Sequence, residues 1–256
     1  MKKFKNFLRN IQIILNNIGI DLLKLKKIIY ISKYINDYLI FKKLKGRIDF
    51  FLPILGEHKE NNSNFDKHYF YQETTVSSYI FNDNPNKHVD VGSRLSGFIG
   101  NVASYRKIEF FDLRPANINH NNIVFKNLDL LNLNDEYSNY TDSLSCLYVL
   151  EHIGLGRYGD RVNPSGSKIG YDNLIKMLKS KGKLYIAIPI ANKSKTYFNA
   201  HKVFEPSEII NWNTNVTLDK FDYVDDNGKY HNNKSLNDSE LHNLNYGCGI
   251  YTFIKN

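Results

Sequence analysis

Residues 88–100, HVDVGSRLSGFIG, decide the fold. A short apolar segment contains Asp90, Gly92 follows it, and Gly97 lies where the chain is expected to enter a helix. Strand, glycine turn and helix form the usual cradle for a nucleotide-like ligand, because glycine lets the backbone approach the ligand and the helix N-terminus supplies free N–H groups. The G-x4-G spacing differs from the G-x-G-x-x-G of dinucleotide folds. A tight turn without a ligand remains the alternative.

A second segment, IEFFDLRP at 108–115, ends its strand in a carboxylate. Asp112 lies 20 residues after Gly92, where a carboxylate can accept hydrogen bonds from both hydroxyls of a ribose. Asp129 follows a third strand and is placed to contact an adenine amino group. The alternatives are a cap or turn role for Asp112 and a turn role for Asp129.

Two later segments carry candidate general bases. Glu151 and His152 follow a strand in SLSCLYVLEHIGLGRYGD, and His201 lies in FNAHKVFEP. Ligands bind at the carboxyl ends of parallel strands, where such groups can take a proton from a substrate hydroxyl. A capping or packing role for His152 and a surface-loop role for His201 are the alternatives. Nothing in the spacing of these residues requires a metal ion, so we expect none.

Strands and helices alternate along the chain, which predicts an α/β fold. The pattern indicates a Rossmann-like, mainly parallel seven-stranded sheet flanked by helices. We expect strands at 88–91, 108–113, 124–128, 143–150, 184–188, 221–224 and 249–254, with helices at 66–80 and 171–178. The polar run at 57–64 marks a boundary between an extension, 1–60, and a main domain, 61–256.

Charge and cysteine content narrow the function classes. The net charge is +8, but residues 1–50 hold twelve Lys and Arg against three Asp and Glu, so the main domain is near neutral. That balance speaks against nucleic acid as a partner. Cys146 and Cys248 are far apart in sequence, which predicts reduced thiols and a cytoplasmic protein.

The N-terminal extension has a helical apolar period and a basic charge. Its seam runs through Phe4, Leu8, Ile11, Leu15, Ile18, Leu22, Leu25 and Ile29. Three interpretations stay open for residues 4–29: a helix docked on its own domain or on a second subunit, a peripheral helix on the inner face of an anionic membrane, or an arm for another partner. Arg9, Asn10 and Asn16 interrupt the apolar run, so we expect no transmembrane or secretory segment.

In its motif order the sequence resembles class I S-adenosylmethionine (SAM)-dependent methyltransferases. The resemblance rests on the acidic residues and glycine loop above, on VLEH at 149–152 and on LIKMLKSKGKLYIAIP at 174–189. It implies that Asp90 and the loop of Gly92 and Gly97 hold the methionine part of SAM, while Asp112 and Asp129 hold ribose and adenine. Arg94 stands near a position where the superfamily usually has glycine, so it either clamps the methionine carboxylate or obstructs the pocket.

DVGSR, FDLRP, LEHIGLGRYGD and FNAHKVF together resemble an uncharacterised bacterial family associated with cell-surface polysaccharide synthesis. This resemblance covers residues 68–256 and implies O-methylation of a sugar or sugar-linked metabolite. His152 or His201 would be the base and Glu151 would orient it. A catalytically silent module in a glycan-assembly complex is the main alternative. An NAD-dependent enzyme and a nucleic-acid methyltransferase are disfavoured by the glycine spacing and the neutral main domain.

Overall fold

The structure is a computed structural model that describes residues 15, 19, 21, 26–59, 61 and 65–256. It divides into two compact units, residues 1–65 and 66–256, and the predicted boundary was placed after residue 60. Most of the predicted N-terminal seam, including Phe4, Leu8, Ile11, Ile18, Leu22 and Leu25, lies outside the described residues.

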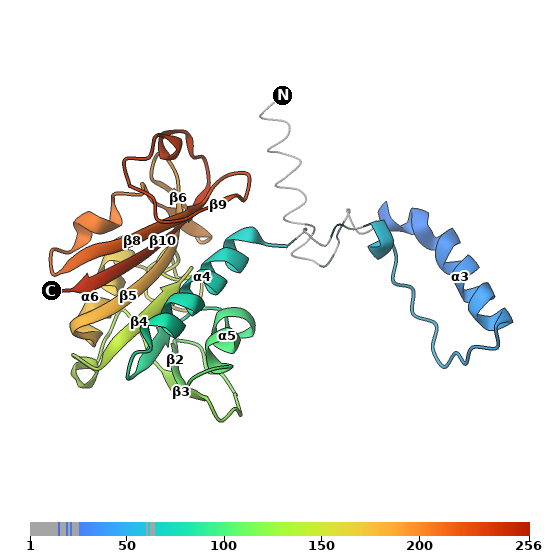
Figure 1. The fold of residues 1–256 in the computed structure, drawn as a ribbon, viewed down its shortest axis with the longest axis horizontal. Helices are drawn as coiled ribbons and strands as arrows, with labels where there is room; N and C mark the ends of the chain where they lie inside the picture. Colours follow the sequence, from blue (N-terminus) through green and yellow to red (C-terminus); the bar gives the residue numbers. More distant parts are fainter. Residues whose placement is uncertain (1–14, 16–18, 20, 22–25, 60, 62–64) are drawn as a thin grey trace. The chain divides into compact units, whose positions relative to one another are not determined.

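The main unit is an α/β layered domain built on one central sheet (Figure 1). Its strand order is β3-β2-β1-β4-β5-β10-β8-β9. The first five strands in that order are parallel, and β10 is antiparallel to both β5 and β8. The strands are β1 (His88–Val91), β2 (Ile108–Asp112), β3 (Ile123–Asn127), β4 (Thr141–Leu147), β5 (Leu178–Ile190), β8 (Val216–Val224), β9 (Tyr230–His231) and β10 (Gly247–Lys255).

The sheet has eight strands, so the prediction of seven is wrong by one. The additional strand is β9, two residues that pair antiparallel with the end of β8. A pair of residues is too short to produce the alternation of apolar and polar side chains by which strands are recognised in sequence. A separate hairpin joins β6 (Lys195–Tyr197) to β7 (His201–Val203), which the sequence pattern also did not predict.

Helices cover both faces of the sheet. They are α4 (Lys67–Asp83), a π-helical turn η3 (Leu95–Ile99) continuing into α5 (Gly100–Ala103), and α6 (Gly166–Met177), with 3-10 turns η4 (Asp135–Tyr137), η5 (Ile209–Trp212) and η6 (Ser239–Asn243). Asp66 caps α4 by accepting from the backbone N–H groups of His68 and Tyr69, and Asn84 ends it in the left-handed conformation.

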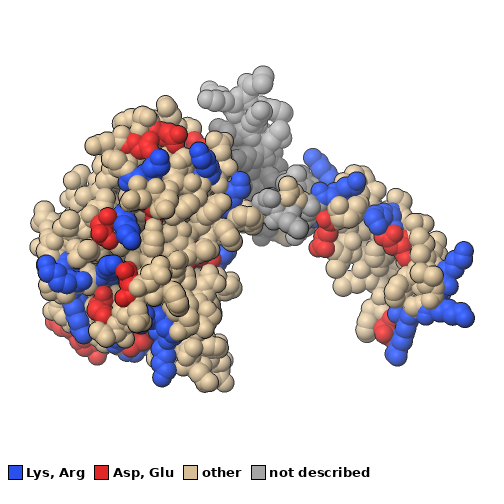
Figure 2. Space-filling view, in the orientation of Figure 1, with Lys and Arg blue, Asp and Glu red and all other residues tan. Residues whose placement is uncertain are grey.

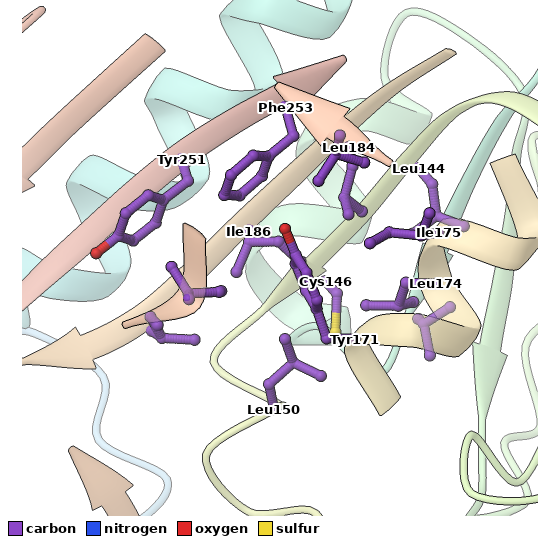
Figure 3. Close-up of a cluster of buried hydrophobic side chains, with 14 of the residues drawn as sticks. Leu144, Cys146, Leu150, Tyr171, Leu174, Ile175, Leu184, Ile186, Tyr251 and Phe253 are labelled. Atoms are coloured by element: carbon purple, nitrogen blue, oxygen red, sulfur yellow. The ribbon is translucent and has the colours of Figure 1, made fainter. Parts of the chain in front are cut away.

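Two apolar clusters, one on each face, hold the layers together. Figure 3 shows the first, in which Tyr171 and Leu174 of α6 meet Cys146 of β4, Ile186 of β5 and Phe253 of β10. The second joins side chains of α4, η3 and α5 to the opposite face, among them Val76, Phe98, Val102, Phe110 and Tyr185. Burial on both faces explains why β5 contains the continuous apolar run LYIAI. Cys146 and Cys248 are free and buried, and burial raises the pKa of both thiols.

The described part of the first unit contains η1 (Lys26–Tyr30), α3 (Ile31–Lys43) and η2 (Glu57–Lys59). An extended stretch returns along α3, and Phe51 packs edge-on against Tyr34 and Tyr38, with ring centroids 5.1 and 5.4 Å apart. Among the described residues, no helix is long and apolar enough to cross a membrane.

Candidate active site

A cleft lies at the carboxyl ends of β1, β2 and β4, the edge at which parallel sheets bind ligands. It consists of two adjoining cavities with empty volumes of about 640 and 960 Å³, which include space open to solvent. Both cavities are lined by Gly92, Asp112, Arg114, Tyr148, His152 and Tyr158. Residues from three separate predicted segments therefore meet at one cleft.

Gly92 forms the floor where the two cavities meet. Its φ of +74° is in the left-handed region, and its N–H donates to the carbonyl of Phe111 over 2.7 Å. A Cβ at this position would lie 3.0 Å from Cγ1 of Val149, which also lines the cleft. Glycine thus lets this turn adopt its conformation and keeps the floor of the cleft open.

Asp90 lies beneath the turn and does not line either cavity. Its carboxylate accepts hydrogen bonds from the backbone N–H of Ser93 (3.0 Å), the hydroxyl of Ser93 (2.6 Å) and the hydroxyl of Ser145 (2.5 Å). Burial raises the pKa of Asp90 to about 7 despite these bonds. His88 extends the network, since its ring contacts the hydroxyls of Ser145 and Ser143. Asp90 therefore fixes the shape of the turn from below.

Asp112 lines both cavities, and its carboxylate is paired with Arg114. The guanidinium donates from Nε to Oδ1 over 3.1 Å and from Nη2 to Oδ2 over 3.0 Å, and the backbone N–H of Arg114 also donates to Oδ1. Arg114 lies over the ring of Tyr158, with its Cζ 4.7 Å from the ring centroid. A ribose bound to Asp112 would share this carboxylate with Arg114 or displace the guanidinium.

The first cavity continues along an apolar wall to Asp129. That wall is formed by Val91, Leu128, Leu130, Leu131, Val149 and Ile153. Asp129 lines the same cavity, and its Oδ1 accepts from the backbone N–H of Leu131 over 2.9 Å. An apolar cavity with a carboxylate in its lining has the chemistry to hold a purine ring and its amino group.

Arg94 lines the second cavity and is held by α4. Its guanidinium forms a bidentate pair with Glu73, at 2.9 and 3.0 Å, and lies 4.4 Å from the ring centroid of Tyr69. Gly97 does not line the cleft. A Cβ on Gly97 would lie 2.3 Å from Glu73 Oε2, so this glycine makes room for the carboxylate that fixes Arg94. The guanidinium forms part of the wall of a cavity that remains open.

His152 lines both cavities, and its ring orientation defines its tautomer. Nδ1 lies 2.7 Å from the carbonyl oxygen of Ala200, an acceptor, so Nδ1 carries the proton and Nε2 has the free lone pair. Burial lowers the pKa of His152 to about 4. The imidazole is therefore neutral near pH 7 and able to accept a proton at Nε2.

Glu151 is buried beside His152 but does not orient it. Its Oε1 lies 3.6 Å from Nε2 of His152, too far for a hydrogen bond, and its Oε2 has no hydrogen-bond partner among the described residues. Burial raises the pKa of Glu151 to about 8. Since both groups are neutral near pH 7, their proximity is not an ion pair. The carbonyl of Ala200 performs the orienting role that the sequence assigned to Glu151.

His201 lies on β7 behind His152 and lines neither cavity. Its ring centroid is 6.4 Å from that of His152 and 5.7 Å from that of Tyr246. Nε2 is buried without a partner among the described residues, and burial lowers the pKa of this histidine. Of the two histidines, only His152 lines the cleft.

The loop after β4 is organised around Asp160. Its Oδ2 accepts from the backbone N–H of Gly154 over 2.6 Å, and its Oδ1 accepts from that of Tyr158 over 3.3 Å. Lys202 anchors the same loop to β7 by donating to the carbonyl of Pro164 and the hydroxyl of Ser167, both at 3.0 Å. These bonds hold Tyr158 at the cleft.

Several residues of the cleft were not predicted from sequence. Arg114 lies in FDLRP and Tyr158 in LEHIGLGRYGD. The positive charge of the first and the aromatic ring of the second are the sequence features that could have indicated a place in the cleft. Glu73 and Tyr69 lie on a helix whose pattern indicates only packing. Tyr148 has a φ of +56°, uncommon for a bulky residue, and contacts Nδ1 of His68 through its hydroxyl at 2.8 Å. No group of His, Cys, Asp and Glu in the described part of the chain could hold a metal ion.

The fold is that of class I SAM-dependent methyltransferases. A crystal structure of coclaurine N-methyltransferase, bound to N-methylheliamine and S-adenosylhomocysteine (SAH), is similar at 8% identity and a TM-score of 0.54, over 77% of this chain and 73% of that one. The 1,6-didemethyltoxoflavin-N1-methyltransferase of Burkholderia thailandensis is similar at 13% identity and a TM-score of 0.50, over 82% and 94%. The [4+2]-cyclase SpnF has 10% identity and a TM-score of 0.50, over 71% and 80%.

Sequence comparison gives the family. A search of curated proteins found no match to this chain. A family model matches residues 107–246, from β2 to the approach to β10, which is more than half of the chain. The chain belongs to the family described as Caenorhabditis protein of unknown function, DUF268.

Proposed function

We propose that this protein transfers the methyl group of SAM to a hydroxyl oxygen of a sugar or sugar-linked metabolite. The observation that carries the proposal is the single cleft in which Gly92, Asp112, Asp129 and His152 meet. The fold by itself does not establish methyl transfer, since one of the structures with a similar fold is named a [4+2]-cyclase.

The residues of the cleft fit SAM. Gly92 leaves space that a Cβ would fill, the apolar wall ending at Asp129 suits adenine, and Asp112 is placed for the ribose hydroxyls. Arg114 occupies three acceptor positions of Asp112, one through its backbone N–H and two through its guanidinium, and a carboxylate has about four. One position is therefore available to a ribose hydroxyl, and displacement of the guanidinium would release two more. Arg94 borders the second cavity, where its charge suits the methionine carboxylate.

SAM supplies a methyl group that its sulfonium already activates. The protein must then position the acceptor and take one proton. His152 lines the cleft with an unprotonated Nε2, and a weak base is adequate because a hydroxyl becomes far more acidic as its oxygen gains the methyl group. Tyr69 and Tyr158 line the second cavity, where a bound sugar would contact their side chains. This proposal extends to surface-glycan synthesis at the inner face of the cell membrane.

Calorimetric titration of the full chain with SAM and with SAH tests the cofactor. We expect micromolar binding that Asp112→Asn weakens by about tenfold or more, the loss expected for a charge-assisted hydrogen bond pair. Asp219→Asn, which changes an exposed carboxylate on β8, is the matched control. If the folded protein binds neither compound, the proposed function is wrong.

The acceptor is tested with labelled SAM and a panel of nucleotide sugars and lipid-linked sugars. Methyl transfer to any of them supports the proposal. SAM binding without transfer to any acceptor would instead favour a catalytically silent module that acts as a partner in glycan assembly. The observation that fits this second function is the pairing of the Asp112 carboxylate with Arg114.

A further inference from the structure

Residues 26–59, the continuous described part of the first unit, contain no buried apolar side chain. Thirteen large apolar side chains between Ile28 and Ile54 are exposed, including Ile29 and Leu52 at 72% and Phe50 at 89%. Within residues 26–59, Gly56 is the one residue that is buried. Ordering a chain costs about 1–2 kcal/mol per residue, so apolar segments that fold normally bury their side chains. Such a concentration of exposed apolar side chains marks an interaction surface.

Helix α3, in the described part of this unit, is amphipathic. Ile31, Tyr34, Ile35, Tyr38 and Leu39 follow the three- and four-residue spacing of one helix face. The returning stretch covers part of that face through Phe51, which nevertheless stays 62% exposed. The apolar face is thus only partly covered within the unit.

The polar part of the unit carries excess positive charge. Residues 26–54 contain seven Lys and Arg and two Asp. The two aspartates pair with Lys33 and Arg47, and the remaining charge includes the cluster Lys42, Lys43 and Lys45. Figure 2 shows basic side chains predominating over this unit, whereas both signs are mixed on the visible face of the main unit.

From this combination we propose that residues 28–54 bind the surface of an anionic lipid bilayer. Exposed apolar and aromatic side chains enter the boundary between headgroups and acyl chains, while neighbouring lysines contact anionic headgroups. Tyrosine suits this boundary because its ring is apolar and its hydroxyl is polar. A second copy of the chain fits less well, since it would bring two positive surfaces together. The proposal concerns a different unit from the cleft and does not depend on methyl transfer.

Co-sedimentation of the full chain with vesicles tests the proposal. We expect binding to vesicles of phosphatidylcholine and phosphatidylserine, weakened by salt, and much weaker binding to phosphatidylcholine alone. Phe50→Glu with Leu52→Glu should reduce the partition coefficient at least tenfold. Val124→Glu, at an exposed apolar position of the main unit, should leave it unchanged. Both Phe50 and Leu52 lie outside any core, so thermal unfolding of the main unit should not change.

Charge-reversal variants measure the electrostatic contribution to vesicle binding separately from the apolar contribution. Lys42→Glu, Lys43→Glu and Lys45→Glu together should abolish the preference for phosphatidylserine, while reversal of Lys107, Lys193 and Lys229, exposed on the main unit, should not. Absence of binding to every vesicle composition would overturn the proposal. So would a wild-type dimer, measured by light scattering, that the Phe50 and Leu52 substitutions convert to a monomer without any effect on vesicle binding.

Discussion

The guanidinium of Arg114 lies alongside the carboxylate of Asp112, with Nε 3.1 Å from Oδ1 and Nη2 3.0 Å from Oδ2. The carboxylate is 9% exposed and the guanidinium 56%. Arg114 is therefore the more exposed partner of the pair, and in the proposed complex with SAM its guanidinium would compete with the ribose for Asp112. In the proposed complex, Arg114 would change the affinity of the cleft for SAM through its pairing with Asp112, without contacting SAM itself.

Arg114→Gln should leave SAM affinity unchanged or raise it by a few-fold, because an exposed arginine contributes little to a pair and its removal releases acceptor positions on Asp112. Calorimetric titration measures the change, and Arg161→Gln, an exposed arginine that lines neither cavity, serves as the control. A loss as large as that caused by Asp112→Asn would show that Arg114 contacts the ligand directly.

His152→Ala should reduce methyl transfer by about a hundredfold, the usual contribution of a general base, with the Kd for SAM changed only a few-fold. The reason is that His152 lines the cleft and its Nε2 has the free lone pair, since Nδ1 donates to the carbonyl of Ala200. The measurement is incorporation of labelled methyl into the acceptor panel. His201→Ala is the comparison, and it should cost much less because His201 lines neither cavity. Equal losses in both variants would contradict a distinct role for His152.

Gly92→Ala should lower the free energy of unfolding by about 1–3 kcal/mol, since alanine is strained at a positive φ and its Cβ would press on Val149. It should also weaken SAM binding by narrowing the cleft. Thermal unfolding and calorimetry measure the two effects. Gly100→Ala is the matched control, because Gly100 has an ordinary helical φ of −62° and its Cβ would meet nothing closer than 3.8 Å.

The stability of the protein should fall as pH rises from about 6.5 to 8. Burial raises the pKa of Glu151 to about 8, so the folded state keeps a proton that the unfolded state releases above its ordinary pKa of 4.5. Each such group lowers the free energy of unfolding by about 1.4 kcal/mol per pH unit while only the folded state holds the proton. Asp90, with a pKa of about 7, acts in the same direction up to that pH.

Below pH 6.5 the histidines oppose this trend. Burial lowers the pKa of His88 to about 3 and of His152 to about 4, so in this range the unfolded state binds two protons that the folded state lacks, which offsets the effect of Glu151 and Asp90. Denaturant unfolding at several pH values should therefore show little change in stability between about pH 5 and 6, a decline above pH 6.5, and a shallower decline in Glu151→Gln. An unchanged slope between pH 6.5 and 8 in that variant would contradict a protonated Glu151, and Asp219→Asn is again the control.

The main elements of the fold could be predicted from sequence because the central strands are buried on both faces. An unbroken apolar run such as LYIAI leaves little choice of structure. Strand β9 and the β6–β7 hairpin were missed because they are short and partly exposed, so they leave no pattern. The carboxylates at strand ends were predicted as one group because parallel strands bring their carboxyl ends to one edge, and the structure does place Asp112, Asp129 and Gly92 in one cleft.

The sequence by itself determined which functional groups stand at the carboxyl ends of the strands. They are a glycine turn after β1, a carboxylate at the end of β2, another carboxylate after β3, and a Glu-His pair after β4. Only the tertiary structure decided what each group does. Folding buries Asp90 under the turn, pairs Asp112 with Arg114, directs Nδ1 of His152 to a carbonyl on the β6–β7 hairpin, and leaves Glu151 protonated. Protonation state and hydrogen-bond partners depend on burial and on residues distant in sequence, and local patterns contain neither.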